Sequence, residues 1–223
     1  MLVNNTFHLS YCTNIHPGSN WESTFTSLKK HVPGIKKEIS PNAEFGLGLR
    51  LSNKASEELN QKDNLEIFTN WLADNGLYVF TMNGFPYGNF HDERVKDQVH
   101  APDWTTIERV RYTKRLFEQL AKLLPEGMSG GISTSPISYK HWHITEAEKE
   151  KAFEIGATHL LEIVEKLYHI EKTTGTYLHL DIEPEPDGLI ENSDEILLLF
   201  EKYLIPQGSM ALPEKLQCSQ NEA

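Results

Sequence analysis

The segment TYLHLDIEPEP, residues 176–186, alternates between apolar and ionisable side chains and then ends in two Glu-Pro dipeptides. Successive side chains of a strand point to opposite faces of its sheet. The segment therefore has an apolar face, made of Leu178, Leu180 and Ile182, and an ionisable face, made of His179, Asp181 and Glu183. Polar groups on a strand need hydrogen-bond partners or a ligand, so the ionisable face is a candidate binding surface.

The same strand pattern occurs four times earlier in the chain, and each strand is followed by a segment with helical periodicity. Strands are expected at 6–14, 45–52, 77–88, 130–136 and 176–186, and helices at 20–39, 56–76, 107–127, 145–175 and 194–205. Pro33 is expected to interrupt the first helix, and glycines at 76, 127 and 175 to end the next three. Thr145 and Glu148 form a capping box at the start of the fourth helix.

Strands that alternate with long helices predict a parallel sheet, because a parallel pair needs a crossover connection. An open doubly wound sheet would have continuous apolar strands, since helices cover both of its faces. These strands instead carry small or polar residues on one face, including Cys12, Gly48, Arg50 and Thr81. A (β/α)8 TIM barrel, whose lumen opens into a site at the carboxyl ends of the strands, explains this asymmetry better.

Five strands are too few to close an eight-stranded barrel. We therefore expect the chain to hold only about the first five β/α units, with residues 1–205 as an incomplete barrel and 206–223 as the truncated start of the next segment. Unpaired strand edges template pairing with other chains. Residues 1–223 alone are expected to form an oligomer or a loosely packed, aggregation-prone species.

Composition excludes several classes of protein. The net charge of −11 and pI near 5.4 argue against a nucleic-acid partner, because phosphate backbones would be repelled. The sequence contains neither a signal peptide nor a long apolar run, so no membrane insertion is expected. Cys12 and Cys218 are too few for a disulfide framework, and we expect a cytoplasmic location.

Four motifs together resemble the EboE metabolite-traffic family, a branch of the xylose-isomerase-like TIM barrels. They are SYCTNIHPGSNWE, FGLGLRLS, YVFTMNGFPYGNFHDERVK and YLHLDIEPEPDGLIENSDE, and the similarity spans residues 6 to about 205. The resemblance implies a cytoplasmic protein that helps to move a metabolite precursor, with a small secondary-metabolite precursor or sugar-like molecule bound at the barrel mouth. In the wider superfamily, the residue matching Glu183 is a divalent-metal ligand in sugar isomerases and epimerases.

The resemblance therefore leaves two functions open. One is metabolite binding without turnover, and the other is a divalent-metal-dependent isomerase or epimerase that removes a proton next to a carbonyl. The metal would be Mn²⁺, Mg²⁺ or Zn²⁺, and the other family ligands would lie beyond residue 223. Phosphoester hydrolases of the endonuclease-IV type have the same fold. Of the three functions, theirs fits the acidic net charge of this chain least well.

Candidate site residues follow from the strand ends. His179 and Asp181 are expected to bind Glu183 or a ligand hydroxyl, to form a buried polar layer with Arg50, or to do both. Glu185 is expected to point away from Glu183. On the first strand, Asn14 is a candidate ligand-binding residue, and His16 is a candidate general base in an ordinary His-Pro-Gly turn.

The loop that follows the third strand is long for a compact domain, which is typical of a functional loop. Asn83 and Tyr87 are candidate ligand-binding residues, and His91 is a candidate catalytic residue. The aromatic residues of this loop are expected either to form a lid with an aromatic wall or to anchor the loop by packing beneath it; they are Phe85, Tyr87, Phe90 and Trp104. The His141–His143 pair has no third ligand nearby and is a weak zinc motif.

Overall fold

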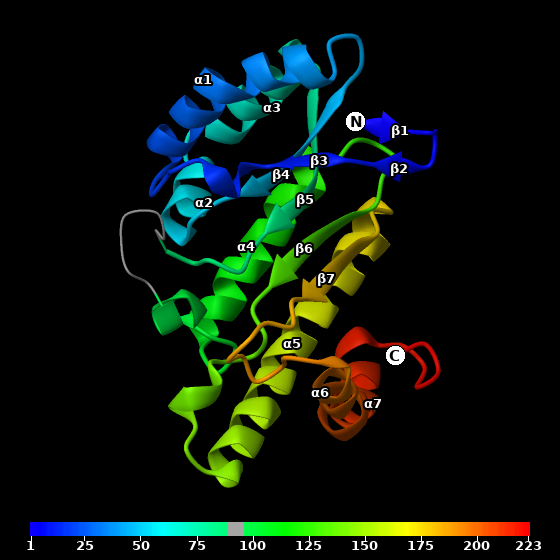
Figure 1. The fold of residues 1–223 in the computed structure, drawn as a ribbon. Coiled ribbons are helices and arrows are strands. Elements are labelled where there is room, and N and C mark those ends of the chain that lie inside the picture. Colours follow the sequence, from blue (N-terminus) through cyan, green and yellow to red (C-terminus); the bar gives the residue numbers. More distant parts are fainter. Residues whose placement is uncertain (89–95) are drawn as a thin grey trace.

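The protein has a mixed α/β fold built on a five-stranded parallel sheet, as shown by a computed structural model that describes residues 1–88 and 96–223 (Figure 1). The strands pair in sequence order: β3 (Ser10–Cys12), β4 (Phe45–Arg50), β5 (Leu77–Asn83), β6 (Gly130–Thr134) and β7 (Leu178–Ile182). A separate antiparallel hairpin of β1 (Leu2–Val3) and β2 (Phe7–His8) precedes them.

The longer helices follow the strands. They are α1 (Trp21–Ile39), α2 (Asn53–Leu59), α3 (Asn64–Asp74), α4 (Ile107–Leu123) and α5 (Glu146–Thr174). After β7 the chain forms α6 (Ser193–Leu198), a π-helical stretch η4 (Leu199–Leu204) and α7 (Ile205–Leu216). Short 3-10 turns are η1 (Thr13–Ile15), η2 (Lys96–His100) and η3 (Lys140–Trp142).

The core lies between one face of the sheet and the helices. Leu47, Val79 and Ile132 on the sheet are fully buried together with helix residues such as Leu116 and Phe117. Burial of an apolar side chain contributes about 1.5–3 kcal/mol, which makes this layer the main stabilising feature of the fold. The apolar face predicted for the strand at 45–52 is confirmed, since its four apolar residues are all buried.

Helix boundaries differ from the sequence predictions in several places. The helix expected at 56–76 is two helices, because Lys62 adopts a left-handed conformation (φ 51°) between α2 and α3. Helix α1 continues through Pro33 without a break. Helix α4 ends at Leu123, and Gly127 (φ 76°) lies in the following turn.

The predicted ends of the longest helix, α5, are confirmed. The Thr145 hydroxyl accepts a hydrogen bond from the Glu148 backbone N–H at 3.2 Å, and the Glu148 carboxylate accepts one from the Thr145 N–H at 2.8 Å. Gly175 ends the helix in the left-handed region, at φ 72°. Such a cap favours glycine because a side chain there would be strained.

The sheet has two edges among the described residues. Strand β3 pairs only with β4, and strand β7 pairs only with β6. A β-bulge in β5 interrupts its register with β4: Val79 pairs with Leu47 and Thr81 with Gly48, which leaves Phe80 as the extra residue. The bulge keeps Val79 and Met82 on the helix-covered side and Thr81 on the other side.

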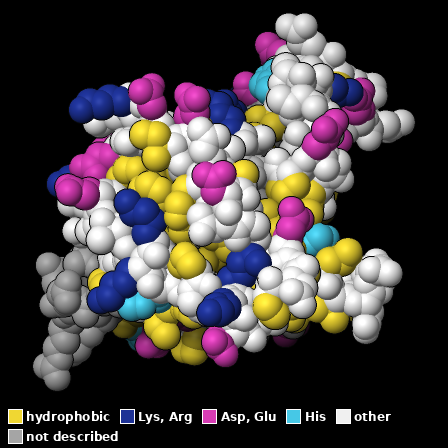
Figure 2. Space-filling view, turned by 90° about the horizontal axis from the view of Figure 1, so that it is seen from above, with side chains coloured by type: hydrophobic (Ala, Val, Ile, Leu, Met, Phe, Trp, Pro, Cys, Tyr) yellow, Lys and Arg dark blue, Asp and Glu magenta, His cyan; other side chains and the backbone are white. Residues whose placement is uncertain are grey.

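The surface carries both signs of charge. Figure 2 shows acidic and basic side chains interspersed on the face that it presents. Across residues 1–88 and 96–223, no helix has the length and apolar composition needed to cross a membrane.

Candidate functional site

The face of the sheet opposite the helical core carries polar and small residues in two parallel rows, and we call these rows the open face. The first row is Cys12, Gly48, Thr81, Gly131 and His179. The second row is Arg50, Asn83, Ser133 and Asp181. The predicted division of the strands into an apolar and a polar face is thus confirmed.

His179 and Asp181 form a hydrogen-bonded pair on the open face. The His179 Nδ1 atom lies 2.8 Å from Asp181 Oδ1, and the two side chains are 44% and 54% exposed. A carboxylate at Nδ1 favours the tautomer that carries the proton there, and this leaves Nε2 as an acceptor. Because both side chains are exposed, His179 and Asp181 do not form the buried polar layer with Arg50 that was one expectation.

Gly131 makes room for this pair on the neighbouring strand. A Cβ at position 131 would lie 2.2 Å from His179 Cε1 and 2.7 Å from Asp181 Oδ2. The imidazole and the carboxylate therefore both lie across strand β6, and only glycine allows this close approach.

A cavity of about 520 Å³ adjoins the pair at the amino-terminal half of the sheet. Its lining includes Phe80, Thr81, Gly131 and His179 from the sheet, together with His8 from the hairpin. The His8 Nδ1 atom lies 2.8 Å from the Tyr78 hydroxyl, and the His8 and Phe80 ring centroids are 5.5 Å apart. The cavity thus combines an aromatic wall with hydrogen-bonding groups, as small-molecule sites do.

Arg50 and Asn83 hold loops at the carboxyl ends of the strands. Arg50 is 3% exposed, and it donates hydrogen bonds to the carbonyl oxygens of Gly18, at 3.1 Å, and Gly88. Burial lowers the pKa of Arg50. The Asn83 Oδ1 atom accepts a hydrogen bond from Phe85 N–H at 2.9 Å. Both side chains thus have structural partners, and ligand binding by either remains a prediction.

Asn14 lies on η1 beside the same strand ends. Its Oδ1 atom is buried and has no hydrogen-bond partner among the described residues. An unsatisfied buried acceptor costs about 1–3 kcal/mol, so this amide is available to a hydrogen-bond donor on a ligand.

Glu183 and Glu185 lie together after β7. The Glu183 N–H donates to Thr134 O at 2.9 Å, so Glu183 continues the pairing with β6. Burial raises the pKa of Glu185, and the nearby Glu183 carboxylate raises it further. The two carboxylates are therefore close enough to interact, although Glu185 was expected to point away from Glu183.

The described residues do not form a complete metal site. No group of three or more His, Cys, Asp or Glu side chains within 1–88 and 96–223 is arranged to hold an ion. The two histidines of the His141–His143 motif have other neighbours: His141 Nε2 lies 3.0 Å from Asp187 Oδ1, and His143 Nε2 lies 2.8 Å from Ser138 Oγ.

The structure does not bring His16 onto the rows of the open face. Its Nε2 atom lies 3.0 Å from the Tyr11 hydroxyl, and its ring stacks on His31 at a centroid distance of 4.8 Å. Tyr87 packs edge-on against Tyr112, at 5.1 Å, and burial raises its pKa. His91, the other catalytic candidate, and Phe90 lie outside the described residues.

Two of the loop aromatics anchor the loop. Phe85 is 6% exposed and Trp104 is fully buried, with its indole N–H donating to Thr134 Oγ1 at 3.1 Å. Phe85 and Trp104 therefore anchor the loop by packing beneath it and do not form a lid.

Sequence reasoning missed Arg109 and Tyr112, which are both fully buried on helix α4. The Tyr112 hydroxyl donates to Leu51 O at 2.6 Å, at the carboxyl end of β4. Positions 109, 112, 113 and 116 lie on one face of α4, and this face is buried. A charged residue on a helix face that otherwise points to the core is the sequence signal that could have identified Arg109.

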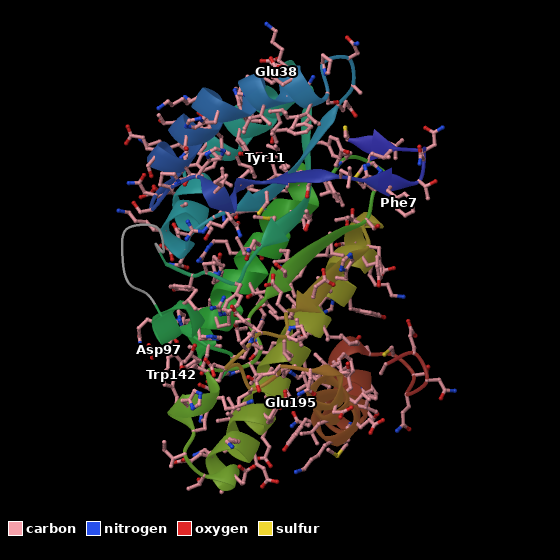
Figure 3. The ribbon with its side chains drawn as sticks, viewed as in Figure 1. Phe7, Tyr11, Glu38, Asp97, Trp142 and Glu195 are labelled. Carbon is pink, nitrogen blue, oxygen red and sulfur yellow. The ribbon has the colours of Figure 1, made fainter. Side chains whose placement is uncertain are left out.

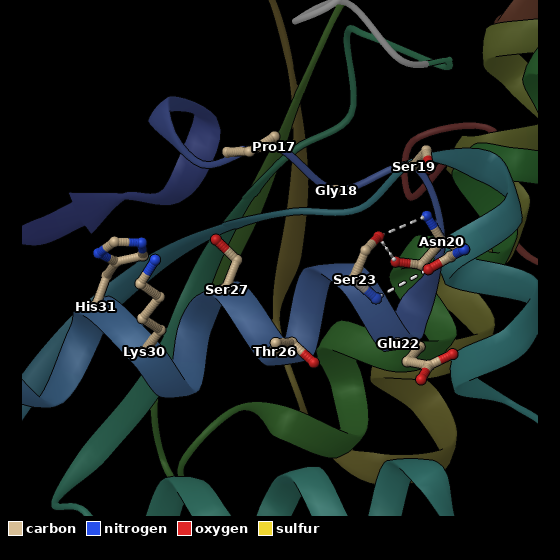
Figure 4. Close-up of a pocket in the computed structure, with 10 residues that line it drawn as sticks. All are labelled: Pro17, Gly18, Ser19, Asn20, Glu22, Ser23, Thr26, Ser27, Lys30 and His31. Atoms are coloured by element: carbon tan, nitrogen blue, oxygen red, sulfur yellow. Dashed lines mark hydrogen bonds between the residues drawn. The ribbon is translucent and has the colours of Figure 1, made fainter.

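A second cavity, of about 600 Å³, lies along α1 on the outside of the fold (Figure 4). Ser27, Lys30 and His31 project toward the segment around Pro17. The amino terminus of α1 is already satisfied, because Asn20 Oδ1 accepts from Ser23 N–H at 2.9 Å and Glu58 accepts from Trp21 N–H at 2.8 Å. We therefore place the candidate site on the open face.

Comparisons with known proteins give no relative for this chain: no family model, curated protein or solved structure matches it.

Proposed function

We propose that this chain binds a small metabolite, as expected of the EboE metabolite-traffic family, but on the open face at the amino-terminal half of its sheet and not at the carboxyl ends of the strands. The sheet would then be the first part of a xylose-isomerase-like barrel. The observation that carries the proposal is the His179–Asp181 pair beside a cavity of about 520 Å³. A ligand there would meet the Nε2 acceptor of His179 and the side chain of Thr81.

The charge of the molecule narrows the ligand class. The net charge is −11, and the described residues that line the cavity include no Lys or Arg. A neutral or weakly basic molecule suits this surface better than a phosphate ester, which would be repelled by the surrounding field. The Asn14 amide offers a further acceptor at the carboxyl end of the sheet.

The experiment uses a small-molecule extract. Purified protein is equilibrated with the extract and re-isolated, and the retained compounds are identified by mass spectrometry. We expect at least one compound to be enriched by the wild type and lost from Thr81→Val, with retention unchanged in Thr158→Val on the surface of α5. Equal retention by all three proteins, or by none, would contradict the proposal.

A divalent-metal isomerase is the second candidate, and one observation favours it. Glu185 lies within electrostatic reach of Glu183, and paired carboxylates are typical ligands of Mg²⁺ and Mn²⁺. The described residues alone do not complete such a site. In a chain that includes the remaining strands, Glu183→Gln should weaken Mn²⁺ binding by about 1 kcal/mol or more, measured by calorimetry. Unchanged affinity would exclude Glu183 as a ligand.

A further inference from the structure

The cavity of about 600 Å³ along α1 lies between that helix and the segment 17–19 (Figure 4). Ser27, Lys30 and His31 belong to its helical wall. Because Lys30 and His31 are three and four positions after Ser27, the three side chains lie on one face of the helix. None of the three has a hydrogen-bond or ion-pair partner within residues 1–88 and 96–223.

The opposite wall of this cavity, the segment 17–19, is held in place from behind. The Gly18 carbonyl accepts a hydrogen bond from Arg50 Nη1 at 3.1 Å, and the Ser19 carbonyl accepts one from the Ser52 hydroxyl at 2.8 Å. Gly18 also packs closely on α1, since a Cβ there would lie 2.4 Å from Thr24 Oγ1. The two walls are therefore fixed relative to each other before any ligand binds.

The segment also contributes a backbone donor. In a trans peptide the N–H and C=O point in opposite directions. The Gly18 carbonyl binds Arg50, so the N–H of the same peptide, that of Ser19, points away from Arg50. The next N–H, that of Asn20, donates to the Ser23 hydroxyl at 3.3 Å, and Ser23 lines the cavity. In the described part of the chain the Ser19 N–H has no acceptor.

The charges on α1 favour an anion at one end of the cavity. The helix carries four lysines and two glutamates, a net charge of +2, although the whole chain carries −11. Glu22 is the one carboxylate among the described lining residues, and it precedes Lys30 by eight positions, or about 12 Å along the helix axis. Glu38 lies two turns beyond His31, near the end of the helix (Figure 3). The lining beside Lys30 and His31 is therefore positive.

We propose that this cavity binds an oxyanion, namely the carboxylate or phosphate group of a small molecule. Lys30 supplies the charge, and the Ser19 N–H, the Ser27 hydroxyl and a His31 ring nitrogen are the further donors. Hydrogen bonds between a charged donor and a charged acceptor are about twice as strong as neutral ones. His16 stacks on the His31 ring at a centroid distance of 4.8 Å and thereby orients it. The site is separate from the open face, and it does not rest on the proposed function.

The test is an amide NMR titration of the protein with sodium phosphate and, separately, with sodium acetate. Sodium chloride holds the ionic strength at about 150 mM, which screens the long-range repulsion from the net negative charge. We expect a saturable shift of the Ser19 amide signal with at least one of the two anions. Saturation by phosphate alone would assign the site to phosphate esters, and saturation by acetate would assign it to carboxylates.

Two variants with the same loss of charge show whether the lining residues are responsible. Lys30→Gln should weaken binding of the anion by about tenfold or more, because the charged donor is lost. Lys37→Gln lies on the same helix but does not line the cavity, and it should change the affinity by less than about twofold. Ser27→Ala should also weaken binding, by about threefold or more, without any change in charge.

Three results would overturn the proposal. The first is a Ser19 amide signal that shows no saturable shift with either anion. The second is an equal affinity in Lys30→Gln and in Lys37→Gln, which would show that the anion responds to the overall charge of the helix. The third is an affinity unchanged in both Lys30→Gln and Ser27→Ala.

Discussion

Arg109 Nη1 donates a hydrogen bond to the carbonyl oxygen of Gly84 at 2.6 Å, although the two residues are 25 positions apart. The same guanidinium donates from Nε to Pro102 O at 2.8 Å. One fully buried side chain thus fastens the chain just after β5 and again just before α4. The position of both segments relative to the sheet depends on it.

Arg109→Lys should lower the free energy of unfolding by about 2–4 kcal/mol, because an ammonium group cannot reach the same set of carbonyls and leaves some of them buried without a donor. Urea denaturation measures the loss. Arg111→Lys, two residues along α4 and exposed, is the matched control and should change stability by less than about 0.5 kcal/mol. Equal effects of the two substitutions would mean that Arg109 does not fasten these segments.

Gly131→Ala should displace the His179–Asp181 pair without unfolding the protein. The three nearest atoms that a Cβ would meet at position 131 belong to these two side chains, so they can move while the backbone stays in place. We expect ¹⁵N NMR to show the Nδ1–H tautomer of His179 in the wild type and its loss in the variant. Gly34→Ala, where a Cβ meets nothing within 4 Å, should leave the tautomer unchanged. A retained tautomer in Gly131→Ala would contradict the geometry described.

Glu185→Gln should stabilise the protein at neutral pH. Burial and Glu183 raise the pKa of Glu185 in the folded state, so the folded chain binds this proton more tightly than the unfolded chain. Protonated Glu185 therefore contributes favourably to the free energy of unfolding. This contribution is fully present below the unfolded-state pKa of Glu185 and is lost as pH rises through its folded-state pKa. The gain from Glu185→Gln, below about 1 kcal/mol because solvent screens this partly exposed group, should thus disappear in acid. A stabilisation that persists unchanged below pH about 4 would argue against this cause.

The free edges of β3 and β7 should make residues 1–223 associate. Among residues 1–88 and 96–223, neither edge pairs with a further strand, and the open face between them is exposed at His179 and Asp181. Sedimentation velocity should show an average mass that rises with concentration, accompanied by binding of a hydrophobic dye. A compact monomer with a sharp cooperative melt would show that the five-stranded sheet is stable with both edges free.

The sequence predicted the sheet and its two faces because strand alternation depends only on local order. It placed Arg50, Thr81, Asn83, His179 and Asp181 on one face, and the strand register confirms this. It could not predict which of these side chains meet. The His179–Asp181 pair depends on the missing side chain of Gly131 on another strand, and Arg50 binds carbonyls of loops whose course no periodicity specifies.

The aromatic enclosure of His100 was missed for a related reason. His100 lies in a loop without periodicity, and its burial depends on rings contributed by Phe85, Tyr139 and Trp142 from three separate segments. The division between α2 and α3 was also missed, because a lysine in the left-handed conformation has no sequence signal comparable to that of glycine.

The bulge at Phe80 makes strand β5 tolerant of a change in length. Regular alternation would place Thr81 on the same side of the sheet as Val79. Because Phe80 is an extra residue, Thr81 lies on the opposite side, and the later residues of β5 alternate from there. Deletion of Phe80 would leave a regular strand in which Val79, Thr81 and Met82 keep their present sides, while removing the ring that walls the cavity. A single-codon deletion would thus reshape the cavity and spare the core.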